Sequence, residues 1–224
     1  MPENDISVII PTLNEVGNIT RVTNHIREIL PRAEIIISDG GSQDGTPRKV
    51  SGMAKIITAE KGRSRQMNAG AKVAQGKILW FLHSDCLPSE RSGDLILGAL
   101  VNDEIVGGGF RWALKGSKWY YGSVTAMAHI KNKLRKNLFG DMGIFVRRNV
   151  FEKLNGYADV PFLEDVEFTA RLKKVGKIRI LDEKLHSSDR RLLEKGPLRS
   201  FIKNDLIKLA YGLGFSPGYL AKFY

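Results

Sequence analysis

Acidic residues follow two apolar runs of this sequence at the point where each run ends. Asp39 comes directly after residues 35–38, and Asp85 comes three residues after the run 78–82. Glu164-Asp165 is a third acidic position, at the start of an amphipathic segment. Carboxylates at the C-terminal ends of neighbouring strands meet on one rim of an open α/β sheet, where such folds bind ligands. Acids beside Gly-rich turns therefore predict a nucleotide diphosphate held through a divalent metal ion.

The segment His83-Ser84-Asp85 is the candidate for the metal site. Mg²⁺ takes few protein carboxylates and completes its shell with phosphate oxygens, so Asp85 and a diphosphate would suffice. Mn²⁺ would also accept the His83 imidazole. Pro88 follows shortly, so the alternative is a core histidine beside a turn; this alternative is slightly favoured for His83, and a metal role is favoured for Asp85.

Three acids stand together in Glu164, Asp165 and Glu167. Acids in a first helical turn are explained by the helix dipole alone. Mutual repulsion among three of them would also raise their pKa values, which a general base requires. One of these carboxylates is therefore predicted to act as a base.

The segment 39–46 (Asp-Gly-Gly-Ser-Gln-Asp-Gly-Thr) has the composition of a ligand-binding turn. Its first two glycines allow the backbone to approach a ligand closely. An Asx turn and a helix cap explain Asp44. They explain Asp39 less well, because a carboxylate that closes a buried strand needs a partner, which a base or a ribose could supply.

Thr12 and Glu15 follow the first apolar run with the three-residue spacing of a capping box. Thr12 also lies at the end of that strand, where a nucleotide base would bind. Both interpretations stay open from the residues alone.

Cations precede a predicted helix at Lys61, Arg63 and Arg65. Cations at this end oppose the helix dipole, and a bound phosphate would relieve that cost. Solvated side chains remain the alternative, above all for Lys61. Asn68 falls inside the same helix, so a role in the site requires its amide to point back to the rim. Arg190-Arg191 could grip a diphosphate with two planar guanidinium groups, with a solvated charge run as the alternative.

The chain has 224 residues and a net charge of +11, which is unevenly distributed. Residues 1–110 carry 12 Lys/Arg and 13 Asp/Glu, a net −1, whereas residues 111–224 carry 23 and 11, a net +12. This asymmetry hints at an anionic partner such as a phospholipid surface, a lipid phosphate or nucleic acid. Scattered lysines favour a merely solubilising surface.

One cysteine, Cys86, excludes an internal disulfide and fits a reducing compartment. The acidic N-terminus lacks the apolar core of a signal peptide, and the uncharged stretch 209–221 is too short to span a bilayer. We therefore expect a cytoplasmic protein, with contact at the inner face of the membrane as an option.

Apolar strand-like runs at 6–10, 35–37, 55–58 and 77–82 alternate with helical patterns at 16–29 and 64–75. This alternation predicts an α/β fold whose mostly parallel sheet is covered by helices on both faces. The second half predicts strands at 106–114 and 144–146. Its expected helices are a basic amphipathic helix near 120–138, another at 164–175 and a last stripe over 198–213. We expect one domain, with a nucleotide-binding half (1–105), an acceptor and catalytic half (106–192) and a basic amphipathic C-terminal segment (193–224).

Taken in order, these motifs resemble glycosyltransferase family 2, whose members have the GT-A fold. The residues that carry the resemblance are 7–15, 39–46, 83–85, 140–148 and 164–165, within a span of about residues 5 to 192. Residues 61–63, 66–70 and 189–191 further resemble a small bacterial subgroup associated with radical-SAM/selenodomain proteins.

The resemblance implies transfer of a sugar, with inversion, from a UDP- or GDP-type donor to an acceptor hydroxyl, assisted by Mn²⁺ or Mg²⁺. It implies Asp165 as the base, with Glu164 beside it, and Asp85 as the metal ligand, with His83 less certain. The implied donor-binding residues are Pro11, Thr12, Asn14, Glu15, Asp39, Arg63, Asn68, Ser84, Arg190 and Arg191. Gly109, Asp141 and Met142 are expected to border the sugar pocket, although glycine also serves tight backbone packing.

Two departures from the family pattern stand out. His83 replaces the first acid of the usual Asp-x-Asp element, which leaves the metal requirement open. Leu192 stands where a tryptophan often follows the arginine pair, which weakens the comparison with processive relatives.

Two rival functions belong to other classes. A sugar-phosphate nucleotidyltransferase would need a Gly-rich loop with a basic residue directly after the first strand, where residues 11–15 stand instead. A non-catalytic basic module that binds membrane or nucleic acid would not need acids at three strand or helix ends, and we expect no nucleic-acid partner. The helix near 118–138 could still dock on an anionic leaflet and suit a lipid-linked acceptor, but internal packing or a dimer contact explains its apolar stripe equally well.

Overall fold

The computed structural model describes residues 2–114, 116, 120–188, 206–207, 210–211 and 213–221. Arg190 and Arg191, most of the expected helical stripe over 198–213 and much of the segment 193–224 lie outside these residues.

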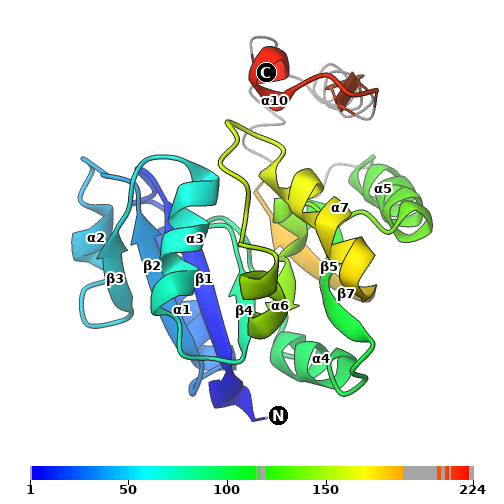
Figure 1. Cartoon of the computed structure of the whole chain (residues 1–224). Coiled ribbons are helices and arrows are strands. Elements are labelled where there is room, and N and C mark those ends of the chain that lie inside the picture. Colours follow the sequence, from blue (N-terminus) through cyan, green and yellow to red (C-terminus); the bar gives the residue numbers. More distant parts are fainter. Residues whose placement is uncertain are drawn as a thin grey trace.

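Within the described residues, seven strands form one sheet in the order β3-β2-β1-β4-β6-β5-β7 (Figure 1). The strands are β1 (Ile6–Thr12), β2 (Glu34–Asp39), β3 (Lys55–Thr58), β4 (Ile78–Phe81), β5 (Ile105–Leu114), β6 (Phe145–Arg147) and β7 (Lys177–Ser187). The helices are α1 (Ile19–Ile29), α2 (Thr46–Lys49), α3 (Arg63–Val73), α4 (Ser92–Ala99), α5 (Tyr121–Arg135), α6 (Arg148–Lys153), α7 (Glu164–Val175) and α10 (Pro217–Leu220), with 3₁₀ turns η1 (Glu3–Asp5) and η2 (Gly140–Met142).

The sheet is mostly parallel, as expected. Strands β1 to β4 all run in one direction, β5 pairs in parallel with β7, and only β6 among the described strands pairs antiparallel with its neighbours β4 and β5. Because β1 lies between β2 and β4, the C-terminal ends of these three strands share one rim of the sheet. The candidate residues that follow them are therefore brought together by topology.

Helices cover both faces of the sheet, which confirms the α/β prediction. Alternate side chains of β1 point to opposite faces: Val8 joins a core with α1 and α4, whereas Ile9 joins a second core with α3, α6 and α7. Burial of Phe168 and Leu172 on α7 matches the predicted stripe, but Val175 is 39% exposed.

Helix α1 begins three residues later than its apolar spacing predicted. The backbone N–H of Glu15 donates to Thr46 Oγ1 (2.9 Å), and that of Val16 donates to Asp44 Oδ2 (2.9 Å). These contacts hold residues 15–16 in the loop, so the helix starts at Ile19 with Asn18 as its N-cap. Thr12 lies in β1 and does not cap α1.

Strand β7 was not predicted, and neither were the short helices α4 and α6. The segment 177–187 alternates exposed charged residues with partly buried apolar ones. Its pairing with β5 shows that this segment is a strand. The register also shifts between Phe110/Leu181 and Arg111/Lys184, so Asp182 and Glu183 are extra residues that interrupt the alternation. No helix within the described part of the chain has the length and apolar content that a bilayer span requires.

Candidate active site

Asp39 is buried at the end of β2, and the protein itself satisfies its carboxylate. Oδ1 accepts from Thr12 Oγ1 (3.0 Å) and Ser42 Oγ (2.6 Å), and Oδ2 accepts from the backbone N–H groups of Gly41 (3.0 Å) and Ser42 (2.8 Å). The partner that this carboxylate needs is thus supplied by its own turn and by the neighbouring strand. The Asp39 carboxylate therefore stabilises the turn after β2.

Asn14 joins the turn after β1 to the turn after β2. Its backbone N–H donates to Ser42 Oγ (2.8 Å), and its side-chain Oδ1 accepts from the Gln43 N–H (2.9 Å). Asn14 has φ of +56°, a left-handed conformation that asparagine tolerates better than most residues. The two turns therefore form one surface at the rim.

Gln66 on α3 braces the same rim, and the sequence analysis did not single it out. Its Nε2 donates to the carbonyls of Thr12 (2.7 Å) and Ser38 (2.9 Å), and this amide therefore links the C-terminal ends of β1 and β2. The side chain packs against Gly40, where a Cβ would lie 3.0 Å from the Gln66 amide carbon. A long polar residue on the inward face of an amphipathic helix was the available signal.

The side chain of Asn68 bonds to the backbone of Tyr157. Its Nδ2 donates to the Tyr157 carbonyl (2.8 Å), and its Oδ1 accepts from the Tyr157 N–H (2.9 Å). Both polar atoms of the amide are therefore used to fix the loop that precedes α7. Asn68 therefore joins α3 to this loop, and its role in donor binding stays a prediction.

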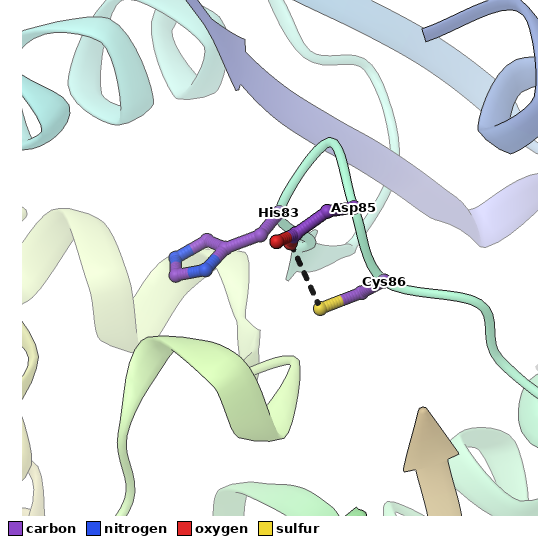
Figure 2. Close-up of side chains that lie close together, drawn as sticks. All are labelled: His83, Asp85 and Cys86. Atoms are coloured by element: carbon purple, nitrogen blue, oxygen red, sulfur yellow. Dashed lines mark hydrogen bonds between the residues drawn. The ribbon is translucent and has the colours of Figure 1, made fainter. Parts of the chain in front are cut away.

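Side chains that can bind a metal gather directly after β4 (Figure 2). His83, Asp85 and Cys86 each offer a ligand atom, and these atoms lie within 4.8 Å of one another. Among the described contacts, the Asp85 carboxylate accepts one hydrogen bond, from the Cys86 thiol at 3.7 Å. Asp85 is therefore far less satisfied by the protein than Asp39.

Burial raises the pKa of the Cys86 thiol well above its usual range, and the charges of Asp85 and Asp141 raise it further. The protonated thiol is a donor to Asp85. A carboxylate and an imidazole fit a hard or borderline divalent ion such as Mn²⁺. The effect of Asp141 on this thiol also places its charge close to the metal candidates.

Gly140 connects the metal candidates with the predicted base. Its backbone N–H donates to Asp165 Oδ2 (2.7 Å), and a Cβ at this position would lie 2.6 Å from His83 Nε2. The imidazole of His83 and the carboxylate of Asp165 thus both lie against Gly140. Residues distant in sequence by more than 80 positions form one cluster.

Glu164 lies beside Asp165 and is buried against a cation. Arg63, the first residue of α3, donates from Nη1 to Glu164 Oε1 (3.2 Å). Burial raises the pKa of Glu164, with a further increase from the Asp165 charge and an opposing decrease from Arg63. Arg63 is thereby held at the site through an acid rather than by the helix alone.

The residue before these acids has an unusual backbone. Leu163 has φ of +62°, which a leucine adopts only under constraint. Phe162 and Leu163 pack with Ile207 and Leu220, described residues of the C-terminal region. These apolar contacts hold the turn that presents Glu164 and Asp165.

Two of the expected sugar-pocket residues are core residues. Met142 is 1% exposed and packs in the core on the α3 side of the sheet, and a Cβ at Gly109 would lie 3.2 Å from the Met142 carbonyl. These contacts fit the packing alternative for Gly109, and the place of both residues at a sugar pocket stays a prediction. Asp141 alone of the three is partly exposed.

Two further residues reach the cluster without having been predicted. Tyr157 is buried with no hydrogen-bond partner for its hydroxyl among the described residues, and burial together with the charges of Asp165 and Glu164 raises its pKa. The backbone carbonyl of His186, near the end of β7, accepts from the Leu87 N–H (2.8 Å), which brings this end of β7 next to the segment that follows β4. Only the tertiary structure shows either proximity.

Comparisons with known proteins agree with this geometry. The family model described as "Glycosyl transferase family 2" matches residues 7–154. The chain is 28% identical over 190 residues to glycosyltransferase AglE from Haloferax volcanii, covering 76% of this chain and 62% of that protein. The chain thus spans about three-fifths of the length of this relative.

Solved structures share the fold. The mannosyltransferase PcManGT from Pyrobaculum calidifontis, in complex with GDP-Man and Mn²⁺, has a TM-score of 0.64 at 20% identity, covering 82% of this chain and 56% of that one. Glucosyl-3-phosphoglycerate synthase from Mycobacterium tuberculosis, in complex with Mn²⁺ and UDP, has a TM-score of 0.63 at 20% identity, covering 90% and 78%. These similarities confirm the expected GT-A type of fold; the predicted subgroup stays a prediction.

Proposed function

We propose a sugar-transfer reaction for this chain, which belongs to glycosyl transferase family 2 because that family's model matches residues 7–154. The substrate is a nucleotide-diphosphate sugar, and the product is a glycoside of an acceptor hydroxyl with inverted anomeric configuration. A divalent metal ion assists. This choice sets aside the sugar-phosphate nucleotidyltransferase, because the family match and the turn at residues 11–15 both favour a glycosyltransferase.

The observation that carries the proposal is the meeting of three chain segments at Gly140. Asp165 Oδ2 accepts from the Gly140 N–H, His83 Nε2 lies against the same glycine, and Asp85 lies two residues from His83. A base and metal-binding side chains within one cluster are what a transfer between a diphosphate sugar and a hydroxyl requires.

The donor would bind along the joined turns after β1 and β2. Thr12, Asn14, Glu15 and Asp39 organise this surface, which supports their role in shaping the nucleotide pocket. Pro11 and Ser84 border the same rim, and Arg63 brings a cation to it. Paired arginines at Arg190 and Arg191 remain candidates for the diphosphate. The GDP-Man and UDP complexes of the similar structures favour a GDP- or UDP-type donor.

Asp85 and His83 would hold the metal ion. When bound, such an ion neutralises charge on the departing diphosphate. The available lone pairs of Asp85 fit this role, since the described residues give this carboxylate only a thiol donor. Asp141 adds negative charge beside the same group.

Asp165 is the proposed base for the acceptor hydroxyl. Its oxygens accept from the N–H groups of Gly140 (2.7 Å) and Val166 (2.7 Å), which fix its orientation and leave further lone pairs available. Proton removal as the oxygen attacks opposite the leaving diphosphate would invert the anomeric centre. The neighbouring Glu164 orients Arg63 and adds to the local negative charge.

A thermal-shift panel of UDP-, GDP- and dTDP-sugars, each with Mn²⁺, Mg²⁺ or chelator, tests donor binding. We expect one nucleotide class to raise the melting temperature, and more so with metal. The Asp165→Asn variant should keep this shift while its transfer rate falls about 10²–10⁴-fold, the usual contribution of a general base.

An Asp159→Asn variant is the matched control, because Asp159 lies in the loop between α6 and α7 but pairs with Arg65 at the surface. Equal transfer rates of Asp165→Asn and the wild type would remove Asp165 as the base. A panel with no response to any nucleotide sugar would remove the proposed function.

A further inference from the structure

Helix α5 has an inverted distribution of side chains. It buries Tyr121, Thr125 and Asn132 toward the protein. Its aliphatic residues Met127, Ile130 and Leu134 are instead 67%, 59% and 79% exposed. A surface helix of a globular protein normally turns its apolar stripe to the core, so this arrangement calls for a binding partner.

The three exposed residues lie on one side of the helix. Their spacing of three and four residues places them within about 60° of one another at ~100° per residue. We call Met127, Ile130 and Leu134 the α5 outer face. Monomeric proteins rarely leave such contiguous apolar surface uncovered unless it binds something.

Polar contacts on the opposite side fix the orientation of α5. His129 Nε2 lies 3.1 Å from Asp182 Oδ1, Lys133 Nζ donates to the same oxygen (2.9 Å), and Asn132 Nδ2 donates to Met142 Sδ (3.7 Å). The helix cannot turn its aliphatic residues inward without breaking these contacts. Exposure of the outer face is therefore built into the fold.

Cations flank the outer face, and no acid is present from residue 121 to residue 136. Lys131 and Arg135 lie about one and two helical turns after Met127, on one flank of the outer face. Lys136 is the C-cap of the helix and has a left-handed conformation. Lys173 of α7 lies near Lys136, and its amine donates to the Arg135 carbonyl (2.9 Å). An apolar centre bordered by Lys and Arg is the composition of a helix that lies in a bilayer interface.

We propose that the α5 outer face docks on an anionic membrane surface, with Met127, Ile130 and Leu134 inserted among the lipids and the flanking cations on the headgroups. Every Lys, Arg, Asp or Glu from residue 121 to residue 136 is a cation, so the flanks of this face complement the charge of an anionic lipid surface. The +12 net charge of residues 111–224 adds further attraction to an anionic surface.

The docking face leads directly into the active-site cluster. Helix α5 ends at Arg135, five residues before Gly140, and its Asn132 contacts Met142 in η2. Membrane contact at α5 would therefore place a membrane-resident acceptor next to the 140–142 segment. This consequence for the acceptor rests on the proposed function, whereas docking itself does not require transfer.

Flotation of the full chain with vesicles tests docking. The chain should float with vesicles of phosphatidylcholine and phosphatidylglycerol, and much less with phosphatidylcholine alone. Lys131→Gln/Arg135→Gln/Lys136→Gln should weaken binding on the order of 100-fold, at about fivefold per cation near the surface. Met127→Ser/Ile130→Ser/Leu134→Ser should also abolish flotation, at low and at high salt.

The matched control is Lys174→Gln/Val175→Ser on α7, which removes an exposed cation and a partly exposed apolar residue elsewhere on the basic half. It should float like the wild type. Loss of binding in Leu213→Ser/Phe215→Ser but not in the α5 variants would overturn the proposal in favour of the exposed C-terminal residues. A dimer in sedimentation velocity that only the serine variant dissociates would assign the face to a second copy.

The donor thermal shift separates this inference from the function. Both α5 variants should keep the nucleotide-sugar response and the wild-type melting temperature within about 2 °C. Normal donor binding without vesicle binding in the wild type refutes docking alone; vesicle binding without any donor response refutes the function alone.

Discussion

One aspartate ends β2 and another follows β4, the two parallel strands on either side of β1, and the two carboxylates have opposite surroundings. Asp39 after β2 is 4% exposed and accepts four hydrogen bonds, two from backbone N–H groups and two from hydroxyls. Asp85 after β4 is partly exposed and accepts one weak bond from a thiol among the described residues. The same residue type at the same rim is thus used in two different ways.

The difference separates building a pocket from binding in it. A carboxylate whose lone pairs are all used by the protein stabilises the turn that surrounds it, and its removal leaves buried donors unpaired. A carboxylate that the protein leaves poorly satisfied retains its affinity for an external cation. Asp39 therefore governs the shape of the rim, whereas Asp85 is the carboxylate that we propose binds the metal ion.

The largest expected effect concerns Asp85. Asp85→Asn should lower the transfer rate about 10²–10³-fold, similar to the loss of one preorganised electrostatic contact, and should remove the metal dependence of donor binding. Its free energy of unfolding should stay close to the wild-type value, because the lost partner is a weak thiol. Calorimetric titration of donor with and without Mn²⁺ measures the first effect, and unchanged metal dependence would exclude Asp85 from the metal site.

Asp39→Asn should show the converse behaviour. It leaves the N–H groups of Gly41 and Ser42 with a poorer acceptor, which should lower the free energy of unfolding by about 2–3 kcal/mol. Urea denaturation of this variant beside Asp85→Asn makes the comparison direct. Equal stability of the two variants would break the distinction between the two carboxylates.

Gly140→Ala should push His83 and Asp165 apart. The new methyl would lie 2.6 Å from His83 Nε2, so local overpacking should cost about 1–3 kcal/mol of unfolding free energy. Transfer should fall as well, because relief of this overpacking would displace the Gly140 backbone, whose N–H donates to Asp165 Oδ2 (2.7 Å). Gly122→Ala is the control, since a Cβ there meets nothing within 4 Å; similar behaviour of both alanine variants would show that Gly140 does not set the geometry.

The smallest effect concerns the pH dependence of stability at Glu164. Burial raises the folded-state pKa of this carboxyl above its ordinary value of 4.5, so the folded state holds the proton more tightly than the unfolded state. The stabilisation is present below that ordinary value and is lost as pH rises through the folded-state pKa. Glu164→Gln should remove this part of the pH profile in chemical denaturation, whereas parallel profiles of variant and wild type would show that Glu164 titrates as it does in the unfolded chain.

How much of this could be predicted from sequence depended on whether the signal was local. Apolar runs before Asp39 and Asp85 fixed the strands and their shared rim, because burial on both faces requires continuous apolar residues. The start of α7 at Glu164 followed from its acids and its apolar spacing. The pairing of Asn68 with Tyr157 and the bonds of Gln66 to the Thr12 and Ser38 carbonyls could not be predicted in this way, because each depends on a partner from another element.

The positions of β1 to β4 along the chain, the acids and the turns were thus determined by the sequence itself, since hydrophobic spacing and turn chemistry act between near neighbours. The tertiary structure alone decided that β7 joins the sheet edge beside β5, that Gly140 lies between His83 and Asp165, and that α5 turns its aliphatic side outward. Each of these outcomes depends on the free energy of contacts between segments far apart in the chain, and no local pattern contains that information.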